Sequence, residues 1–332
     1  MSAAGRKKRR NSPVLAELNQ EDDRVAGSRL NAATVERAGR VEGPDFICVG
    51  MGSTATGWLF DQLKYHPDFW MPPVKELGYL KRETPLVRAT VRKRLERFTK
   101  KMEAGAAAEQ WSSRLARDQR DLQFLSEAAA SSGKPRDMAL YASLFRFKGD
   151  LLSGEITPGY SALTPAVISE IAKHLPDTKI FLMIRDPLER TWSATCKRYR
   201  KGKIERNVIE DPAALRAFLE GPQTVGSNLF PTPIVKRWNQ NAPNMNFRVF
   251  LFDNVARDSA AARREILLHI GGDPEKPSGT LPAEHDRKSK RERFELTGGV
   301  RQALIDYFAD ELRACAEVLG GAATEWPKKY GL

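Results

Sequence analysis

The sequence has few residues of the kinds that bind metals. Among its 332 residues are three cysteines and four histidines. Cys48, Cys196 and Cys315 lie far apart and show none of the spacings typical of metal ligands, so we predict no metal site. An odd number of cysteines in a chain without a secretory signal also indicates reduced thiols and a cytoplasmic location.

Long apolar stretches are missing as well. A membrane-spanning helix needs about 20 mostly apolar residues, and no run in this sequence approaches that length, so we predict no transmembrane segment. The basic cluster "RKKRR" (6–10) has no apolar core behind it, which excludes a secretory signal. Residues 1–44 are polar and almost free of aromatic side chains. We therefore predict a disordered N-terminal tail and a single domain over residues 45–332.

Positive charge is abundant, and the net charge is +12. Such a charge fits a nucleic acid, a membrane surface or an acidic small ligand, and a run of charges can also be a solvated face. The densest runs are "RKKRR", "KRYRKGK" and "RKSKRER". No zinc-finger, homeodomain or RNA-binding motif accompanies them, so we predict no nucleic-acid partner.

Apolar strands alternate with helical segments along the chain. Buried strands are predicted at residues 46–50, within 149–163, within 179–187, where a charged turn follows the apolar run, and at 247–255. Helical spacing follows three of them and also marks residues 87–98, 111–130 and 298–320. This order predicts an α/β fold with a parallel β-sheet flanked by helices on both faces.

The stretch "FICVGMGSTATGWLF" (46–60) predicts a buried strand, a Gly-containing turn and an amphipathic helix. A helix start offers free N–H groups and the positive end of a dipole, which together suit a phosphate. The pattern G-x-x-x-x-G-K-[ST] is absent, because Ser53 stands where a phosphate-binding loop normally has lysine. An ordinary nucleotide kinase, ATPase or GTPase is therefore not supported. A Gly-containing turn between a strand and a helix can also bind no ligand at all.

A second segment, "IRDPLERTWSAT", has an arginine at the end of a buried strand. Arg185 at the strand end and Ser193 on the following helix could reach one phosphate at the carboxyl edge of the sheet. The alternative is that Arg185 pairs locally with Asp186 and that Ser193 is a surface residue.

Two further segments carry charges that could serve a reaction. In "PPVKELGYL", Glu76 and its neighbour Lys75 follow a rigid Pro-Pro pair, and a carboxylate beside a phosphate loop could act as a general base. "DRKSKRERF" has cations and a serine in an irregular segment, which suits a loop over a multiply charged anion. Alternatively, Glu76 is a surface residue and the basic segment is a solvated linker.

Taken in order, "VGMGSTATGWLFDQLKYHPDFWMPPVKELGYL", "GEITPGYS", "IFLMIRDPLERTWSAT" and "RKSKRERF" resemble the sulfotransferases that use 3′-phosphoadenosine 5′-phosphosulfate (PAPS). The resemblance covers residues 45–331. It is closest to the branch of bacterial sulfotransferases and sulfotransferase domains of heparan sulfate enzymes, for which "PPVKE" and "GEITPGY" are typical.

The resemblance implies a P-loop-like sulfotransferase fold, PAPS as donor and adenosine 3′,5′-bisphosphate (PAP) as product. The acceptor would be a hydroxyl or amine of a carbohydrate, lipid or small molecule. Arg185 and Ser193 match the pair that holds the 3′-phosphate, and Glu76 matches the catalytic base. The loop that binds the 5′-phosphosulfate corresponds to Gly52, Ser53, Thr54, Ala55, Thr56, Gly57 and Trp58.

Two more parts of the site are implied by the same resemblance. Lys288, Ser289 and Lys290 lie in the segment that matches a late loop over the nucleotide. Glu155 and Tyr160 lie in the segment that borders the acceptor.

The sequence departs from the family pattern at two positions. The family usually has lysine at Ser53, where it stabilises charge on the departing nucleotide, and often histidine at Gly78. Lys75 could lean toward the leaving group instead, and Lys290 is a further candidate. The alternative function is a sulfotransferase-like nucleotide-binding protein with little turnover.

Overall fold

A computed structural model describes residues 43–81, 89–105, 113–221, 229–285, 294–296 and 298–332. The predicted tail lies outside these residues, apart from Gly43 and Pro44. No helix of the described part is both long and apolar enough to cross a bilayer.

The centre of the fold is a parallel sheet of four strands with the order β2-β1-β3-β4. Ile47 of β1 pairs with Glu155 of β2 on one side and with Ile180 of β3 on the other. The strands are β1 (Phe46–Cys48), β2 (Gly154–Ile156), β3 (Lys179–Ile184) and β4 (Phe247–Leu251). All four run parallel and bring their carboxyl ends to one edge of the sheet, as predicted.

The predicted strand over residues 247–255 is shorter than expected. The strand over 247–255 ends at Leu251, and Phe252–Arg257 forms helix α11 instead. Asp253 and Asn254 explain the change, because both have low strand propensity and an acidic side chain suits the first turn of a helix.

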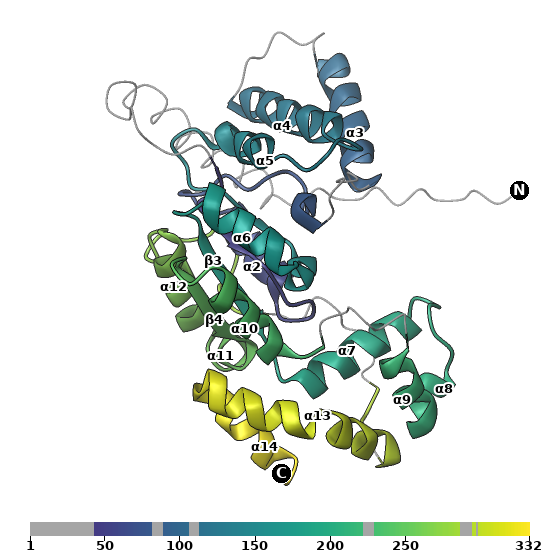
Figure 1. Ribbon diagram of the computed structural model, residues 1–332. Helices are drawn as coiled ribbons and strands as arrows, with labels where there is room; N and C mark the ends of the chain where they lie inside the picture. The colour runs from purple at the N-terminus through teal and green to yellow at the C-terminus, as the bar shows by residue number, and fades with distance from the viewer. Residues whose placement is uncertain (1–42, 82–88, 106–112, 222–228, 286–293, 297) are drawn as a thin grey trace, which may run out of the picture.

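Helices cover both faces of the sheet, as predicted (Figure 1). Ile47, Ile180 and Leu182 point into the larger core, whereas Phe46 and Phe181 point into the smaller one, because side chains alternate along a strand. The larger core contains side chains of α6 (Pro165–His174), α10 (Pro231–Asn241) and α13 (Gly298–Leu319). The smaller one contains side chains of α2 (Thr56–Lys64), α11 and α12 (Ser259–Ile270).

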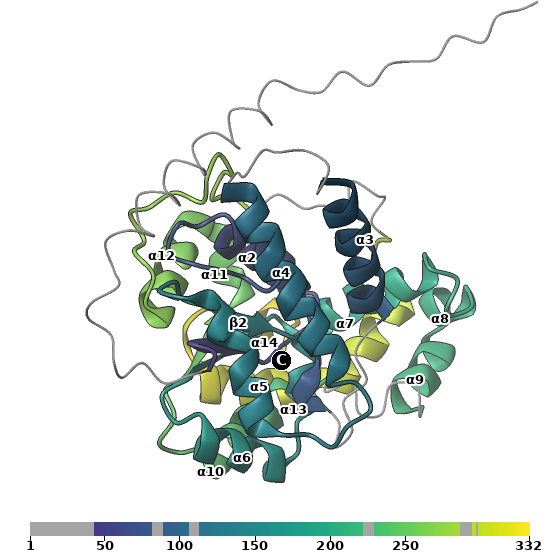
Figure 2. The ribbon, with the colours of Figure 1, turned by 90° about the horizontal axis from the view of Figure 1, so that it is seen from above.

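Two helical groups extend beyond the sheet at opposite ends of the molecule in Figure 1. One group is α3 (Ala89–Gly105), α4 (Ser113–Ala130) and α5 (Met138–Ser143). The predicted helices over 87–98 and 111–130 are confirmed here, and they run side by side when seen from above (Figure 2). The other group is α7 (Pro187–Tyr199), α8 (Asn207–Glu210), α9 (Pro212–Glu220), α13 and α14 (Glu325–Lys329).

Short 3-10 turns connect these elements. They lie at Tyr79–Lys81, Leu144–Lys148, Pro158–Ala162 and Gly321–Thr324. Helix α13 packs against both α7 and α14, so the C-terminal part of the chain lies next to the helix that follows Arg185.

Candidate functional site

The loop between β1 and α2 has the backbone shape of an anion cradle. Ser53 and Ala55 both have left-handed backbone angles, with φ of 67° and 64°. Ala55 caps α2 without a side-chain hydrogen bond, and Thr54 Oγ1 donates to Met51 O at 2.5 Å. Within the described part of the chain, the N–H groups of residues 53–57 donate to no protein acceptor. Unused N–H groups at a helix start favour a bound anion.

A cation lies beside this loop. Lys75 Nζ is 3.3 Å from Thr56 Oγ1, and a Cβ atom added to Gly57 would lie 3.8 Å from the same ammonium. Lys75 is half-buried and belongs to the segment that follows the Pro-Pro pair. The loop thus has a lysine ammonium at its helix end, although position 53 is serine.

Glu76 follows Lys75 in an unusual conformation. Its φ is 61°, a left-handed value that costs a non-glycine residue roughly 1–3 kcal/mol. Such a backbone persists only where its surroundings hold it. The hydrogen bonds of the next residues provide that support.

Glu155 anchors the segment after Glu76. Its carboxylate accepts from Gly78 N at 2.7 Å, Thr157 Oγ1 at 2.5 Å, and the hydroxyls of Tyr141 and Tyr160 at 2.8 Å each. Burial raises the pKa of Glu155, and these four hydrogen bonds oppose that rise. A carboxyl with four donors is a fixed point of the structure.

Tyr160 extends this anchor, because its hydroxyl accepts from Leu80 N at 3.0 Å. Glu155 and Tyr160 are buried and do not appear among the described residues that line the large pocket. Their hydrogen bonds with Gly78 N and Leu80 N hold the segment that follows Glu76. Direct contact with an acceptor, implied for both by the resemblance, stays a prediction.

Arg185 lies directly after β3, at the carboxyl edge of the sheet. Asp186 caps α7, because its Oδ1 accepts from Leu188 N at 2.9 Å and Glu189 N at 3.2 Å. Arg185 donates to Glu189 Oε2 at 2.7 Å, and its guanidinium carbon lies 4.7 Å from the centre of the Phe252 ring. The local partner of Arg185 is therefore Glu189, and not Asp186 as the alternative supposed.

Arg185 has unused donor capacity. Its Nε atom is buried and has no hydrogen-bond partner within the described residues. A buried donor without a partner costs about 1–3 kcal/mol, so it favours a ligand that can accept from it.

A pocket of about 1340 Å³ lies between the loop after β1 and the Arg185 segment. Ser53 and Ala55 of the loop line it together with Arg185 and Ser193. The structure thus brings together the first two candidate segments, which are far apart in the sequence. The pocket wall also has cationic and aromatic side chains: Lys197, Arg200, Lys201, Arg301 and Lys329, with Trp192, Phe252, His285, Phe294 and Tyr330.

Lys75, Glu76 and Trp58 are not among the described residues that line this pocket. Trp58 is buried, its Nε1 donates to Ala283 O at 3.0 Å, and its ring meets His285 edge-on. Lys288, Ser289 and Lys290 fall outside the described residues, although His285 and Phe294 on either side of that segment line the pocket.

Several pocket residues were missed by sequence reasoning. Phe252 could have been found, because it follows a buried parallel strand, as Arg185 does. Arg301, Lys329 and Tyr330 gave no such signal, since they belong to the C-terminal helices and reach the pocket only through tertiary packing.

No protein-family model and no curated protein sequence matches the chain. Among solved structures, it is similar to a sulfotransferase from Alicyclobacillus acidocaldarius, with a TM-score of 0.56 and 20% identity over 85% of this chain and 98% of that one. This similarity shows that the chain has the fold of that sulfotransferase, which confirms the predicted fold class.

Two other solved structures are more distant. The sulfotransferase domain from the curacin biosynthetic pathway has a TM-score of 0.45 and 10% identity, over 82% of this chain and 99% of that one. A sulfotransferase from Mycobacterium avium has a TM-score of 0.37 and 15% identity, over 90% of this chain and 76% of that one.

Proposed function

We propose that this protein is a sulfotransferase that moves a sulfuryl group from PAPS to a hydroxyl or amine of a carbohydrate, lipid or small-molecule acceptor. The observation that carries the proposal is that the loop after β1 and the Arg185–Ser193 pair line one pocket. PAPS has a 5′-phosphosulfate and a 3′-phosphate, so it needs two anion sites at the two ends of one pocket.

The chain has suitable donors for both ends of such a nucleotide. The unused N–H groups of residues 53–57 would bind the 5′-phosphate. Arg185, with its unpartnered Nε, and Ser193 would bind the 3′-phosphate. Recognition of the 3′-phosphate would distinguish PAPS from ordinary adenine nucleotides.

The chemistry would be an in-line displacement at sulfur. Glu76 would take the proton of the acceptor as the new bond to sulfur forms. Lys75, beside Thr56, would stabilise the negative charge that stays on the 5′-phosphate when the bridging S–O bond breaks. The protein otherwise positions the two reactants, as in phosphoryl transfer.

The alternative, a nucleotide-binding protein with little turnover, rests on the serine at position 53. The ammonium of Lys75 weighs against it, because it supplies a cation 3.3 Å from Thr56 Oγ1 at the same loop.

Calorimetry with PAP and with AMP tests the nucleotide site. We expect PAP to bind at least about tenfold more tightly than AMP, which lacks the 3′-phosphate. Absence of binding by both would overturn the proposal. A screen of acceptors with labelled PAPS then tests transfer, and tight PAP binding without transfer to any acceptor would favour the low-turnover alternative.

A further inference from the structure

The C-terminal end of the chain forms part of the pocket wall. Lys329 is the last residue of α14, and it lines the pocket together with Tyr330. The Tyr330 hydroxyl donates to Asp186 Oδ2 at 2.6 Å. Since the other oxygen of Asp186 caps α7, this bond fastens the C-terminus to the first turn of the helix after Arg185.

One carboxylate links two cations at this wall. Glu189 Oε2 accepts from Arg185 at 2.7 Å, and Glu189 Oε1 accepts from Lys329 Nζ. Lys329 Nζ also lies 3.7 Å from Asp186 Oδ2. Burial alone would raise the pKa of Glu189, but the bonds from Arg185 and Lys329 outweigh it and lower the pKa.

Glu189 uses only part of what these cations offer. It accepts from one terminal nitrogen of Arg185, while the Nε atom has no partner within the described residues. A phosphate has more oxygens than a carboxylate and could bind both nitrogens of the guanidinium edge and the ammonium at once. The Glu189 side chain is 38% exposed, so it has room to turn toward solvent.

We propose that Lys329 is a second cation of the 3′-phosphate site, and that Glu189 holds Arg185 and Lys329 in place until the phosphate displaces its carboxylate. The inference rests on the proposed function, because it needs a nucleotide with a 3′-phosphate. It assigns the C-terminal helix a role in recognising that group.

Lys329→Ala in the full chain tests the cation. Calorimetry should show PAP binding weakened about tenfold, the effect of one charge-assisted hydrogen bond. AMP binding should change less than about twofold, because AMP lacks the group that Lys329 contacts. Lys328→Ala is the matched control: Lys328 is the preceding residue, is exposed and pairs with Glu325, so neither affinity should change.

Glu189→Gln tests the displacement. The substitution keeps the side-chain shape and removes a negative charge beside the bound phosphate. PAP should bind about three- to tenfold more tightly, and the gain should shrink at high salt because charges are screened. Weaker PAP binding would show that Glu189 only orients Arg185 and would overturn the displacement.

The results separate this inference from the proposed function. If the unaltered protein binds neither PAP nor AMP, the proposed function itself is wrong. If it binds PAP, and Lys329→Ala and Lys328→Ala bind PAP equally well, only the role of Lys329 is wrong.

Discussion

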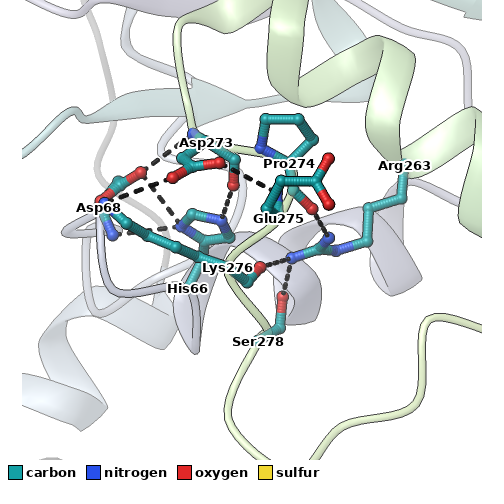
Figure 3. Close-up of polar contacts among 8 residues, drawn as sticks. All are labelled: His66, Asp68, Arg263, Asp273, Pro274, Glu275, Lys276 and Ser278. Carbon is teal, nitrogen blue, oxygen red and sulfur yellow. Dashed lines mark hydrogen bonds and ion pairs between the residues drawn. The ribbon is translucent and has the colours of Figure 1, made fainter.

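The two ends of helix α2 contrast in how their polar groups are used. At its start, the N–H groups of residues 53–57 have no acceptor within the described chain, and Lys75 lies beside them. Past its end, a cluster of polar side chains lies between the loop after α2 and the loop after α12 (Figure 3). The members of this α2 C-terminal cluster are His66, Asp68, Arg263, Asp273, Lys276 and Ser278.

The α2 C-terminal cluster satisfies its charged groups internally. Asp68 accepts from Lys276 Nζ at 2.8 Å and from Asp273 N at 3.0 Å. Burial alone would raise the pKa of Asp68, but these bonds outweigh it and lower the pKa. His66 Nε2 lies 2.9 Å from Asp273 O, and Asp68 N donates to His66 Nδ1 at 3.1 Å.

Arg263 and Arg185 show the difference within one residue type. Arg263 donates to the carbonyls of Pro274 and Lys276 and to Ser278 Oγ (Figure 3). It also donates from Nε to Gln62 Oε1. Every nitrogen of its guanidinium is used, whereas Arg185 keeps an unpartnered Nε within the described residues. Buried charge therefore does not by itself mark a ligand site. An unpartnered donor beside a pocket, such as Arg185 Nε, favours a ligand that can accept from it.

The largest expected effect concerns Glu76, the proposed general base. Glu76→Gln keeps the shape of the side chain and removes the carboxylate. We expect sulfuryl transfer to fall by about 10²- to 10⁴-fold, the usual contribution of a general base, while PAP still binds. Unchanged turnover, with chemistry shown to limit the rate, would contradict the role of Glu76.

Restoring a cation in the loop should have the next largest effect. Ser53→Lys should raise transfer by up to about 10²–10³-fold, the effect of one preorganised contact with developing charge. The gain should be smaller if Lys75 already supplies that contact, and Lys75→Ala should then lower transfer. If neither change alters a rate limited by chemistry, no leaving-group contact exists at this loop.

Removing the charge of Arg185 should weaken nucleotide binding. Arg185→Ala should weaken PAP binding by about 10- to 150-fold, because a charge-assisted hydrogen bond is lost. Adenosine 5′-phosphosulfate, which lacks the 3′-phosphate, should be affected much less. Equal losses for the two ligands, measured by calorimetry, would remove the assignment of Arg185.

The sequence was sufficient to predict which segments of the candidate site directly follow a strand and therefore lie at the same edge of the sheet. The turn after β1 and the Arg185 segment meet because parallel strands bring their carboxyl ends to one edge. It was not sufficient for Lys329, whose contact with Glu189 depends on how α14 packs against the rest of the chain. It also could not separate Arg185 from Arg263, since the partners of both are set by tertiary contacts.

Glu155 shows an intermediate case. Its segment was recognised from the sequence, but its hydrogen bonds with Tyr141 of α5 and with Gly78 N are not indicated by any local pattern. The strand over 247–255 was overestimated for a different reason: the apolar run hid the helix-favouring Asp253.

Disrupting the α2 C-terminal cluster should lower the stability of the fold more than it weakens PAP binding. Arg263→Ala leaves buried acceptors without their donor and should lower the free energy of unfolding by about 1–3 kcal/mol. Arg264→Ala, at the exposed neighbouring residue, is the control and should stay within about 0.5 kcal/mol. Chemical denaturation measures both. A larger loss of PAP affinity for Arg263→Ala than for Arg185→Ala would show that the two ends are not separate in function.

The smallest expected effect is a pH dependence of stability that comes from His66 in the α2 C-terminal cluster. Burial lowers the pKa of His66 below its usual 6.5, and the nearby cations Arg263 and Lys276 act in the same direction, against Asp68 and the carbonyl of Asp273. The folded structure therefore favours the neutral form of His66, whose Nδ1 accepts from Asp68 N. As the pH falls below 6.5, the unfolded chain binds a proton at this residue before the folded one does. The contribution of His66 to the free energy of unfolding should therefore fall as the pH drops from 6.5 toward the lowered pKa, by up to about 1.4 kcal/mol per pH unit.

The His66 contribution can be isolated by comparing slopes of stability against pH. His269 is also buried with a lowered pKa and contributes with the same sign, so the whole protein should lose stability below pH 6.5 even without His66. His66→Gln should reduce the slope just below pH 6.5 by up to one proton's worth. Equal slopes for the unaltered protein and His66→Gln would contradict the lowered pKa of His66.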